Sequence, residues 1–322
     1  MASGETILVA GAGALGSVVG GLLARAGFAV TLLGRRAHLA AVCARGLAVE
    51  GLFGAHRVSG LACATDPREL RGPYATILLT AKAYDTRALA AAVAPHLAAD
   101  GFLLSLQNGL GNVEAAAETV GAARVLGARV IFGAELVEPG RVRVTVYADP
   151  VLVGSPDPAD PARRAAAVRW AAHLAAAGIP AEPTDDIVAA LWAKVLYNAA
   201  LNPLGALLGV PYGALPANPD TRAVMDAVIE EAFAVARAEG VALPWPDAAA
   251  YREAFYGRLV PSTAGHRSSM LQDIERGRPT EIDAINGQVV TRGAARRILT
   301  PVNTTLTRLV RACARRGGED VG

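Results

Sequence analysis

The fold is decided by one stretch near the start of the sequence, Gly11-Ala12-Gly13-Ala14-Leu15-Gly16. An apolar run over residues 7–10 predicts a buried strand before it, and the residues up to about position 26 predict a helix after it. Gly27 ends that helix, and residues 29–33 predict a second strand. The sequence therefore predicts a strand-helix-strand unit with a glycine-rich turn at its centre.

The spacing of the three glycines is typical of a dinucleotide-binding turn. The first glycine permits a tight bend, the second lets the backbone approach a pyrophosphate, and the third allows close packing of helix on strand. The N-terminus of the helix then faces the anion. Because the motif follows a strand and opens a helix, we expect a dinucleotide to be bound by Gly11, Ala12, Gly13, Ala14, Leu15 and Gly16. The alternative is a turn that only packs two elements closely.

Basic residues stand at the end of the second predicted strand, where NAD-binding units usually carry Asp or Glu. The sequence there is Leu33-Gly34-Arg35-Arg36. A guanidinium binds a 2′-phosphate in bidentate fashion, whereas a carboxylate would repel it. We therefore expect NADP(H) rather than NAD(H), with Arg35 as the phosphate ligand and Arg36 as the second choice. The alternative is that these arginines are solvated loop residues.

Strands and helices continue to alternate through the first half of the chain. Residues 76–80 and 102–106 predict strands, whereas residues 85–99, the segment from 112 and residues 163–177 predict helices. Residues 124–153 return to strand patterns around a turn at 138–140. Polar residues follow two of the strands, at Thr80-Ala81-Lys82 and Gln107-Asn108-Gly109, which is where a doubly wound sheet binds its ligands.

The second half is predicted to be almost entirely helical. The predicted helices cover residues 186–208, 220–239, 264–276, 283–297 and 302–316. Pro180 and Pro183 interrupt regular structure between the two halves of the chain, so we place the domain boundary near Thr184. The prediction is an α/β fold in which a doubly wound sheet, residues 1–184, is followed by an all-helical C-terminal domain, residues 185–322.

The composition excludes several classes of protein. The 322 residues are 52% hydrophobic and 19% charged, with a formal net charge of +2, which argues against disorder and against nucleic acid as a partner. Three cysteines without a C-x-x-C pair and five histidines without ligand-like spacing indicate neither disulfides nor a metal, and they fit the cytoplasm. Residues 6–24 are uncharged, but their five glycines and the preceding Glu5 favour a buried strand and helix over a membrane span or a signal peptide.

Only two of the 31 basic residues are lysines, Lys82 and Lys194, and the other 29 are arginines. An arginine keeps its proton near neutral pH, whereas a desolvated lysine can release one. The two lysines are therefore candidates for a functional role, although a few lysines could also survive by chance.

One of these lysines belongs to a polar stripe on a predicted helix. Lys194, Asn198 and Asn202 are four residues apart, so each step advances only about 40° around the helix axis. Pro203 is expected to kink or end this helical segment. An amine and two amides that face inward need a ligand or partner. The alternative is an exposed amphipathic face.

A second polar group stands at Ser268-Ser269-Met270-Leu271-Gln272-Asp273 and at Arg278-Pro279-Thr280-Glu281-Ile282-Asp283. Thr280 and Asp283 have nearly the spacing of a capping box, which would place Glu281 in the first turn of a helix, where a carboxylate is stabilised. Capping alone would account for these three residues without any ligand.

Taken together, these motifs resemble the ketopantoate reductase (2-dehydropantoate 2-reductase) family, and the similarity runs nearly from end to end. The motifs that carry it are Gly11 to Gly16, Thr80-Ala81-Lys82, Gln107-Asn108-Gly109, Lys194-x3-Asn198-x3-Asn202-Pro203, Ser268 to Asp273 and Thr280 to Asp283. Six motifs in the right order are far more specific than any one of them. Both lysines of the chain fall on functional positions of the family.

The resemblance implies a Rossmann domain followed by a helical domain, with catalysis in the cleft between them. It implies that NADPH reduces the C2 carbonyl of ketopantoate to give pantoate, on the pantothenate route to coenzyme A, while Lys194 donates the proton. By the same match Arg35 reads the 2′-phosphate and Lys82 and Asn108 lie near the nicotinamide. Glu281 corresponds to the family's active-site glutamate, placed beside the coenzyme. The residues that hold the substrate would be Asn108, Lys194, Asn198, Asn202 and Ser269.

The chain departs from the family pattern at two positions. Tyr212 stands where some members have a further substrate-contacting Asn, and Phe132 stands in a region that is often small or polar. Reduction of a 2-oxo acid by NADPH is therefore better supported than ketopantoate in particular. The alternatives are a relative that reduces another oxo acid or forms a secondary amine, and a nucleotide-sensing protein without turnover, against which the polar stripe argues. We expect a small-molecule 2-oxo acid as partner, no nucleic acid and no membrane, and the apolar faces of the helical half could pair in a homodimer.

Overall fold

The computed structural model describes residues 4–319, and its contacts divide the chain into two units. Unit 1 comprises Met1–Asn108 and Asn112–Ile187, and unit 2 comprises Gly109–Gly111 and Val188–Gly322. The expected limits, 1–184 and 185–322, therefore need correction at residues 109–111 and 185–187. The short loop Gly109–Gly111 belongs to unit 2 because the Leu110 amide donates to the Ala284 carbonyl at 2.8 Å.

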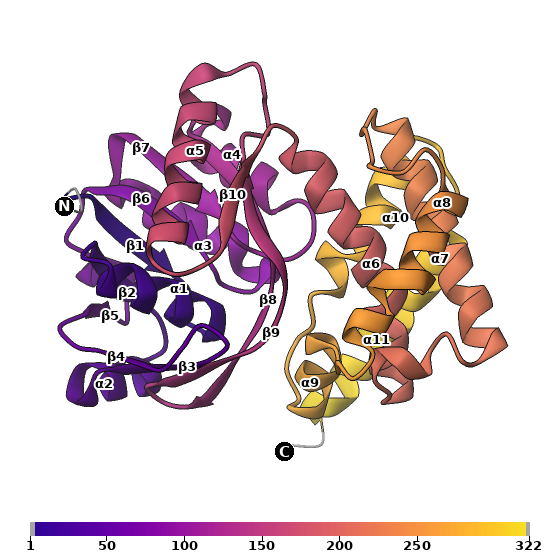
Figure 1. Ribbon diagram of the computed structural model, residues 1–322, viewed down its shortest axis with the longest axis horizontal. Helices are drawn as coiled ribbons and strands as arrows, with labels where there is room; N and C mark the ends of the chain where they lie inside the picture. The colour runs from indigo at the N-terminus through magenta and orange to yellow at the C-terminus, as the bar shows by residue number, and fades with distance from the viewer. Residues whose placement is uncertain (1–3, 320–322) are drawn as a thin grey trace. The chain divides into compact units, whose positions relative to one another are not determined.

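Unit 1 is built on a ten-stranded sheet with the order β4-β3-β9-β8-β7-β6-β1-β2-β5, and β10 pairs with β9 (Figure 1). The strands are β1 (Thr6–Ala10), β2 (Ala29–Leu33), β3 (Leu47–Gly51), β4 (His56–Val58), β5 (Ala62–Ala64), β6 (Tyr74–Leu79), β7 (Leu97–Ser105), β8 (Val125–Glu138), β9 (Arg141–Gly154) and β10 (Ala181–Thr184). Strands β7-β6-β1-β2-β5 are all parallel, whereas β8 with β9 and β3 with β4 are antiparallel. The predicted α/β class with a mostly parallel sheet is confirmed.

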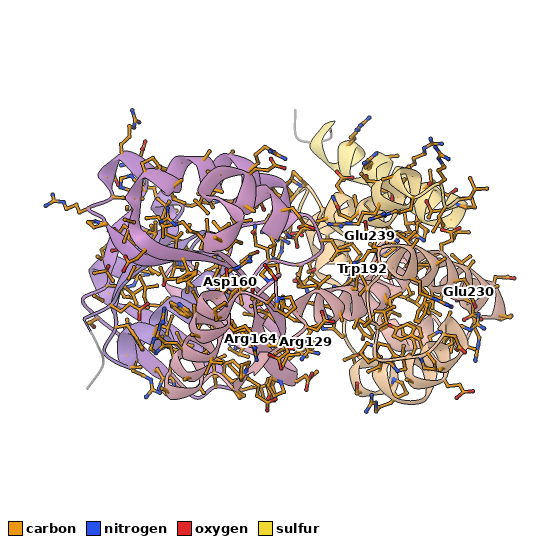
Figure 2. The ribbon with its side chains drawn as sticks, turned by 90° about the horizontal axis from the view of Figure 1, so that it is seen from above. Arg129, Asp160, Arg164, Trp192, Glu230 and Glu239 are labelled. Atoms are coloured by element: carbon orange, nitrogen blue, oxygen red, sulfur yellow. The ribbon has the colours of Figure 1, made fainter. Side chains whose placement is uncertain are left out.

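Helices cover both faces of this sheet. They are α1 (Ala14–Arg25), α2 (Arg36–Arg45), α3 (Thr86–Val93), α4 (Asn112–Val120) and α5 (Pro161–Ala176). Successive residues of β1 point to opposite faces, so Val9 packs in one core with α1 and α5, and Leu8 packs in a second core with α3 and α4. Asp160 caps α5 by accepting from the backbone amides of Ala162 and Arg163 (Figure 2). The doubly wound arrangement holds the carboxyl ends of the parallel strands at one edge.

The structure corrects the predicted element bounds in several places. The helix expected over 85–99 ends at Val93, because a 3₁₀ turn containing Pro95 follows it. Leu97 is already the first residue of β7, where it pairs with Tyr74 of β6. The region 36–73, for which no elements were predicted, forms α2, β3, β4 and β5. The two strands around the turn at 138–140 are confirmed as the long hairpin β8–β9.

Unit 2 is helical and has its own core. Its helices are α6 (Ile187–Leu208), α7 (Pro219–Ala238), α8 (Ala248–Ala254), α9 (Ser269–Glu275), α10 (Asn286–Ala295) and α11 (Pro301–Glu319). Trp192 of α6 is fully buried and belongs to this core (Figure 2). Glu239, just after α7, forms an ion pair with Arg292 of α10 at 2.9 Å. The all-helical prediction for this half is confirmed.

Three local features of unit 2 differ from expectation. The helix predicted over 264–276 begins only at Ser269, because the Ser268 side chain caps it by accepting from the Leu271 amide. The helix predicted over 283–297 is a 3₁₀ turn, Ile282–Ala284, followed by α10. Helix α8 was not predicted. Of the described helices, α6 alone is long and apolar enough to cross a membrane, and 67% of the relevant window is buried inside the protein, as in a core helix.

Candidate active site

The glycine-rich turn has the geometry that a pyrophosphate requires. Gly11 has a φ of +108°, and a Cβ there would stand 2.4 Å from the Ala81 nitrogen. A Cβ on Gly16 would stand 2.5 Å from both the Gly11 carbonyl and the Thr80 hydroxyl. A Cβ on Gly13, in contrast, would meet only the Gly11 oxygen, at 4.0 Å. Two glycines are therefore required by packing, whereas Gly13 leaves open space in front of the backbone.

The first turn of α1 is free to receive an anion. Gly13 is the N-cap residue, and no side chain caps the helix there. The N-terminal amides of a helix carry a partial positive charge and bind phosphate without a specific side chain. The turn also lies close to Gly34, where an added Cβ would stand 2.9 Å from the Ala12 methyl. These residues fit a dinucleotide.

The two arginines after β2 are exposed to solvent. Arg35 is the N-cap residue of α2, Arg36 is its first residue, and both are exposed. Neither guanidinium pairs with a carboxylate among the side chains that the structure describes. An exposed guanidinium at the end of the second strand suits a 2′-phosphate.

A buried hydrogen-bond network joins the two polar loops that follow β6 and β7. The Gln107 side-chain amide donates to the Ala81 carbonyl at 3.0 Å and to the Thr86 hydroxyl at 2.7 Å. The Thr86 hydroxyl donates to Asn112 Oδ1 at 2.8 Å, and Asn112 Nδ2 donates to the Asn108 carbonyl at 2.8 Å. The network thus holds the backbone at Ala81, directly before Lys82, and at Asn108 itself. Lys82 and Asn108 are half-buried. Thr86 and Asn112 were not predicted, because neither stands in a recognised motif.

The polar stripe on α6 is not an exposed amphipathic face. Asn198 and Asn202 are 8% and 5% exposed, and Lys194 is half-buried. The apolar residues beside them, Val195 and Leu196, lie in the unit 2 core. A helix face with two amides and an amine inside a protein is costly unless those groups have polar partners, which favours the functional interpretation.

Tyr212 lies against this stripe. The residue belongs to the 3₁₀ turn Tyr212–Ala214, it is 4% exposed, and its hydroxyl donates to Asn202 Oδ1. Burial raises the pKa of this hydroxyl, so it stays protonated and remains a donor. With Oδ1 engaged, the NH₂ group of Asn202 is oriented away from Tyr212. The other departure from the family pattern, Phe132, packs edge-on against Phe53 with ring centroids 5.1 Å apart in unit 1.

The two serines before α9 have different roles. Ser268 is fully buried, caps α9, and lies with its hydroxyl 3.5 Å from the Asn202 carbonyl. Ser269 is the first residue of α9 and is exposed. The structure thus brings the start of α9 next to the end of the polar stripe, with Ser269 as the serine whose hydroxyl is not used for capping.

Glu281 lies in a different turn from the one predicted. It is 7% exposed and precedes the 3₁₀ turn Ile282–Ala284, and no side chain caps that turn. Asp283 instead forms an ion pair with Arg311 of α11 at 2.6 Å. The capping-box interpretation of Thr280 and Asp283 is therefore wrong, because the chain makes a short turn where a regular helix start was expected. Capping does not explain why Glu281 is buried.

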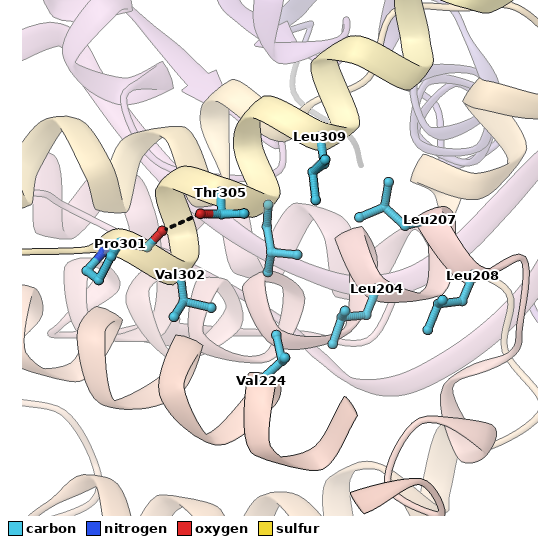
Figure 3. Close-up of a pocket in the computed structure, with 9 residues that line it drawn as sticks. Leu204, Leu207, Leu208, Val224, Pro301, Val302, Thr305 and Leu309 are labelled. Carbon is cyan, nitrogen blue, oxygen red and sulfur yellow. Dashed lines mark hydrogen bonds between the residues drawn. The ribbon is translucent and has the colours of Figure 1, made fainter. Parts of the chain in front are cut away.

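Two hollows in unit 2 lie away from the stripe. One, of about 530 Å³, is lined by Leu204, Leu207, Leu208, Val224, Pro301, Val302, Thr305, Leu306 and Leu309 (Figure 3). Its walls contain no charged side chain, so it does not suit a carboxylate. The other, of about 400 Å³, lies beside Thr280 and Asp283 and is bordered by Arg311 and Arg315. Among the described residues, no group of three or more His, Cys, Asp or Glu side chains is placed to hold a metal ion.

The sequence matches two family models along most of its length. Residues 7–157 match the model of ketopantoate reductase PanE/ApbA, and residues 186–314 match the model of the ketopantoate reductase PanE/ApbA C terminal. Together the two models cover both units.

Relatives named 2-dehydropantoate 2-reductase align over nearly the whole chain. The protein from Aquifex aeolicus is 36% identical, over 95% of this chain and 96% of its own length. The protein from Halobacterium salinarum is 37% identical, over 97% of this chain and 99% of its own length.

Solved structures give the same result for the fold. A PanE/ApbA family ketopantoate reductase from Ralstonia eutropha has a TM-score of 0.86 and 37% identity, covering 97% of this chain and 99% of that one. A D-mandelate dehydrogenase, solved with NADH and anilino(oxo)acetate, has the same TM-score and coverage at 27% identity. The chain therefore belongs to the ketopantoate reductase family of NAD(P)-dependent oxidoreductases.

Proposed function

We propose that the protein reduces the C2 carbonyl of 2-dehydropantoate to a hydroxyl with NADPH, as the reductive step of pantothenate and coenzyme A biosynthesis. The observation that carries the proposal is the polar face of α6, where one of only two lysines lies in line with two buried amides. An ammonium beside amide donors suits a 2-oxo acid, which has a carboxylate to bind and a carbonyl oxygen to protonate.

The coenzyme would be held by unit 1. The α1 amides and the Gly11–Gly16 turn would bind its pyrophosphate, Arg35 its 2′-phosphate, and Lys82 and Asn108 would lie at its nicotinamide end. When bound, this coenzyme supplies hydride to a carbonyl carbon. The Gln107 network supports this assignment, because it fixes both loops that carry Lys82 and Asn108.

The substrate would be held by unit 2, with Asn108 of unit 1 as a further contact. Lys194 Nζ would donate a proton to the alkoxide oxygen as it forms, and then regain one from solvent. The amides of Asn198 and Asn202 and the hydroxyl of Ser269 would orient the carboxylate and hydroxyl of the acid. Glu281 would act with Lys194 at the reacting end and contact the coenzyme.

A panel of 2-oxo acids assayed with NADPH and NADH tests the proposal. The parent should turn over ketopantoate with the highest kcat/KM, and Lys194→Ala should lose most of this activity. Arg237→Ala, which removes an exposed cation from α7, should keep it. If another 2-oxo acid is reduced and ketopantoate is not, the named substrate is wrong. If the coenzyme binds but no acid is reduced, the protein is a nucleotide sensor and the proposal fails.

A second candidate is an NADH-dependent dehydrogenase of an aromatic 2-hydroxy acid. It is favoured by the similarity to the D-mandelate dehydrogenase solved with NADH, at a TM-score of 0.86. The exposed pair Arg35 and Arg36 argues against it, since NAD carries no 2′-phosphate. Benzoylformate in the same panel separates the two candidates.

The setting we propose is the cytoplasm, with the small-molecule acid as partner and neither nucleic acid nor membrane involved. A formal net charge of +2 over 322 residues supports the absence of a nucleic-acid partner. The exposed leucines Leu208, at the end of α6, and Leu309, in the middle of α11, support a homodimer through unit 2.

A further inference from the structure

Pro203 interrupts the hydrogen bonding of the helix that carries the polar stripe. The α6 helix runs through Pro203 and continues to Leu208. Proline has no backbone N–H, so the carbonyl of Ala199, four residues earlier, lacks its usual helical donor. Ala199 is fully buried. A buried carbonyl without a donor is unfavourable, so this carbonyl needs a substitute donor.

Asn286 supplies that substitute. Its side-chain Nδ2 lies 3.0 Å from the Ala199 oxygen, and the residue is fully buried at the start of α10. Ala199 stands directly after Asn198, and Asn202 stands directly before Pro203. The substituted hydrogen bond therefore lies within the segment of α6 that carries both amides of the stripe.

The orientation of Asn286 is fixed by further contacts. The same Nδ2 donates its other hydrogen to Asn303 Oδ1 at 2.9 Å, and Asn303 Nδ2 donates to Glu231 Oε2 at 2.7 Å. The Glu231 carboxylate also accepts from the backbone amides of Val302 and Asn303 at the start of α11, at 2.8 and 2.9 Å. A chain of hydrogen bonds thus runs from α7 through α11 and α10 to the proline-freed carbonyl of α6.

The hydrogen bonds of the Asn286 side chain show that the residue acts as a donor at this position. Asn286 Oδ1 is buried and has no hydrogen-bond partner among the described residues, whereas both N–H groups of the amide are used. The amide is therefore oriented by its donors, at the expense of its acceptor.

Building on the proposed function, we propose that Asn286 is a positioning residue for the reaction. It replaces the N–H that Pro203 lacks and holds the turn of α6 between Ala199 and Pro203, which joins Lys194 and Asn198 to Asn202. Without this hydrogen bond the two halves of the stripe lose their relative orientation, and the 2-oxo acid is held less precisely. A purely structural role would lower stability and leave substrate handling unchanged.

A double-mutant cycle tests this proposal, because Pro203→Ala restores the missing N–H. In the parent background, Asn286→Leu should lower Tm and raise the KM for the oxo acid about tenfold, with the KM for NADPH unchanged. In the Pro203→Ala background, the same change should have a markedly smaller effect on both quantities. Thr307→Val, which removes a buried hydroxyl from α11, should lower Tm without raising the KM for the acid.

Equal losses in the two backgrounds would show that Asn286 does not replace the proline's missing donor. A fall in Tm without a rise in the KM for the acid would reduce Asn286 to a structural residue and overturn the positioning role. If Asn286→Leu alone is insoluble, a soluble double variant supports the proposal and an insoluble one contradicts it. The Tm measurements do not depend on activity. A parent that reduces no oxo acid therefore refutes the proposed function. If Asn286→Leu lowers Tm equally with and without Pro203, the role of Asn286 is refuted instead.

Discussion

At the residue scale, the proposed preference for NADPH rests on Arg35, which is exposed where β2 ends and α2 begins. We predict that Arg35→Glu raises the KM for NADPH about 10- to 100-fold, because a charge-assisted bidentate contact of about 1.5–3 kcal/mol is lost and repulsion replaces it. The KM for NADH should change little. Arg237→Glu, which reverses the charge of an exposed cation on α7, is the control. An equal loss for both coenzymes would mean that Arg35 does not read the 2′-phosphate.

The Tyr212 hydroxyl is expected to influence binding of the 2-oxo acid, because it donates to Asn202 Oδ1 and so orients the Asn202 amide. Tyr212→Phe leaves Oδ1 of Asn202 without its donor and lets the amide rotate, so the KM for the 2-oxo acid should rise about fivefold to tenfold. Tyr197→Phe is the control, since that hydroxyl pairs with Thr263 and not with the stripe. Steady-state kinetics that show the same change in both variants would contradict the orienting role.

At the element scale, the same added methyl group should affect stability at one glycine of the turn and coenzyme binding at another. Gly16→Ala places a Cβ 2.5 Å from the Gly11 oxygen, so it should destabilise unit 1 by about 1–3 kcal/mol. Gly13→Ala adds a methyl to open space at a φ of −84°, so Tm should be unchanged. The KM for NADPH should nevertheless rise about tenfold, because the methyl obstructs the approach of the pyrophosphate.

Melting curves and coenzyme titrations of the two variants check this prediction. A Gly13→Ala variant that binds NADPH normally would remove the turn from the coenzyme site. A Gly16→Ala variant with the parent's Tm would mean that the third glycine is not required for packing.

Much of the element order could be predicted from sequence, because periodicity and turn residues are local signals. Residues 29–33 were predicted as β2 with its observed bounds, and the hairpin turn at 138–140 was located by Pro139 and Gly140. The helix predicted over 85–99 was too long because Ala98 and Ala99 suit a helix, whereas pairing of β7 with β6 makes them part of a strand. The short strands β4 and β5 have three residues each, too few for a recognisable alternation.

At the scale of the whole molecule, the stripe could be predicted and its neighbours could not. Lys194, Asn198 and Asn202 follow the period of one helix, which a sequence displays directly. The contacts of Tyr212 and Asn286 with the stripe depend on how the chain returns to α6 after many residues. Glu281 received an active-site role only through the family motif, and its turn was mistaken for a helix start.

Stability of the whole molecule should depend on pH through two histidines, the buried His38 in unit 1 and the half-buried His266 in unit 2. Burial lowers the pKa of His38 and of His266 below the ordinary value. His38 Nδ1 accepts from the Gly140 amide at 3.1 Å and its Nε2 lies 2.9 Å from the Ser17 hydroxyl, so the neutral ring is the bonded form. Because the pKa is depressed on folding, the stabilisation is complete above about pH 6.5 and is lost as pH falls below that value.

We therefore predict that Tm falls between about pH 7 and about pH 5, and that the fall is smaller in His38→Gln. His96→Gln serves as the control. Thermal melting at a series of pH values measures the slope, and an unchanged slope in His38→Gln would show that this ring does not contribute to it.

The central claim is that Lys194 donates the proton, and Lys194→Arg tests it most directly, because arginine keeps the charge but does not release a proton near neutral pH. Pre-equilibrated with NADPH, the variant should bind the 2-oxo acid with a KM within about threefold of the parent's, while kcat falls by a factor of about 100 or more. If Lys194→Arg instead turns over the acid at a rate near that of the parent, the proton comes from another group and the proposed mechanism is wrong.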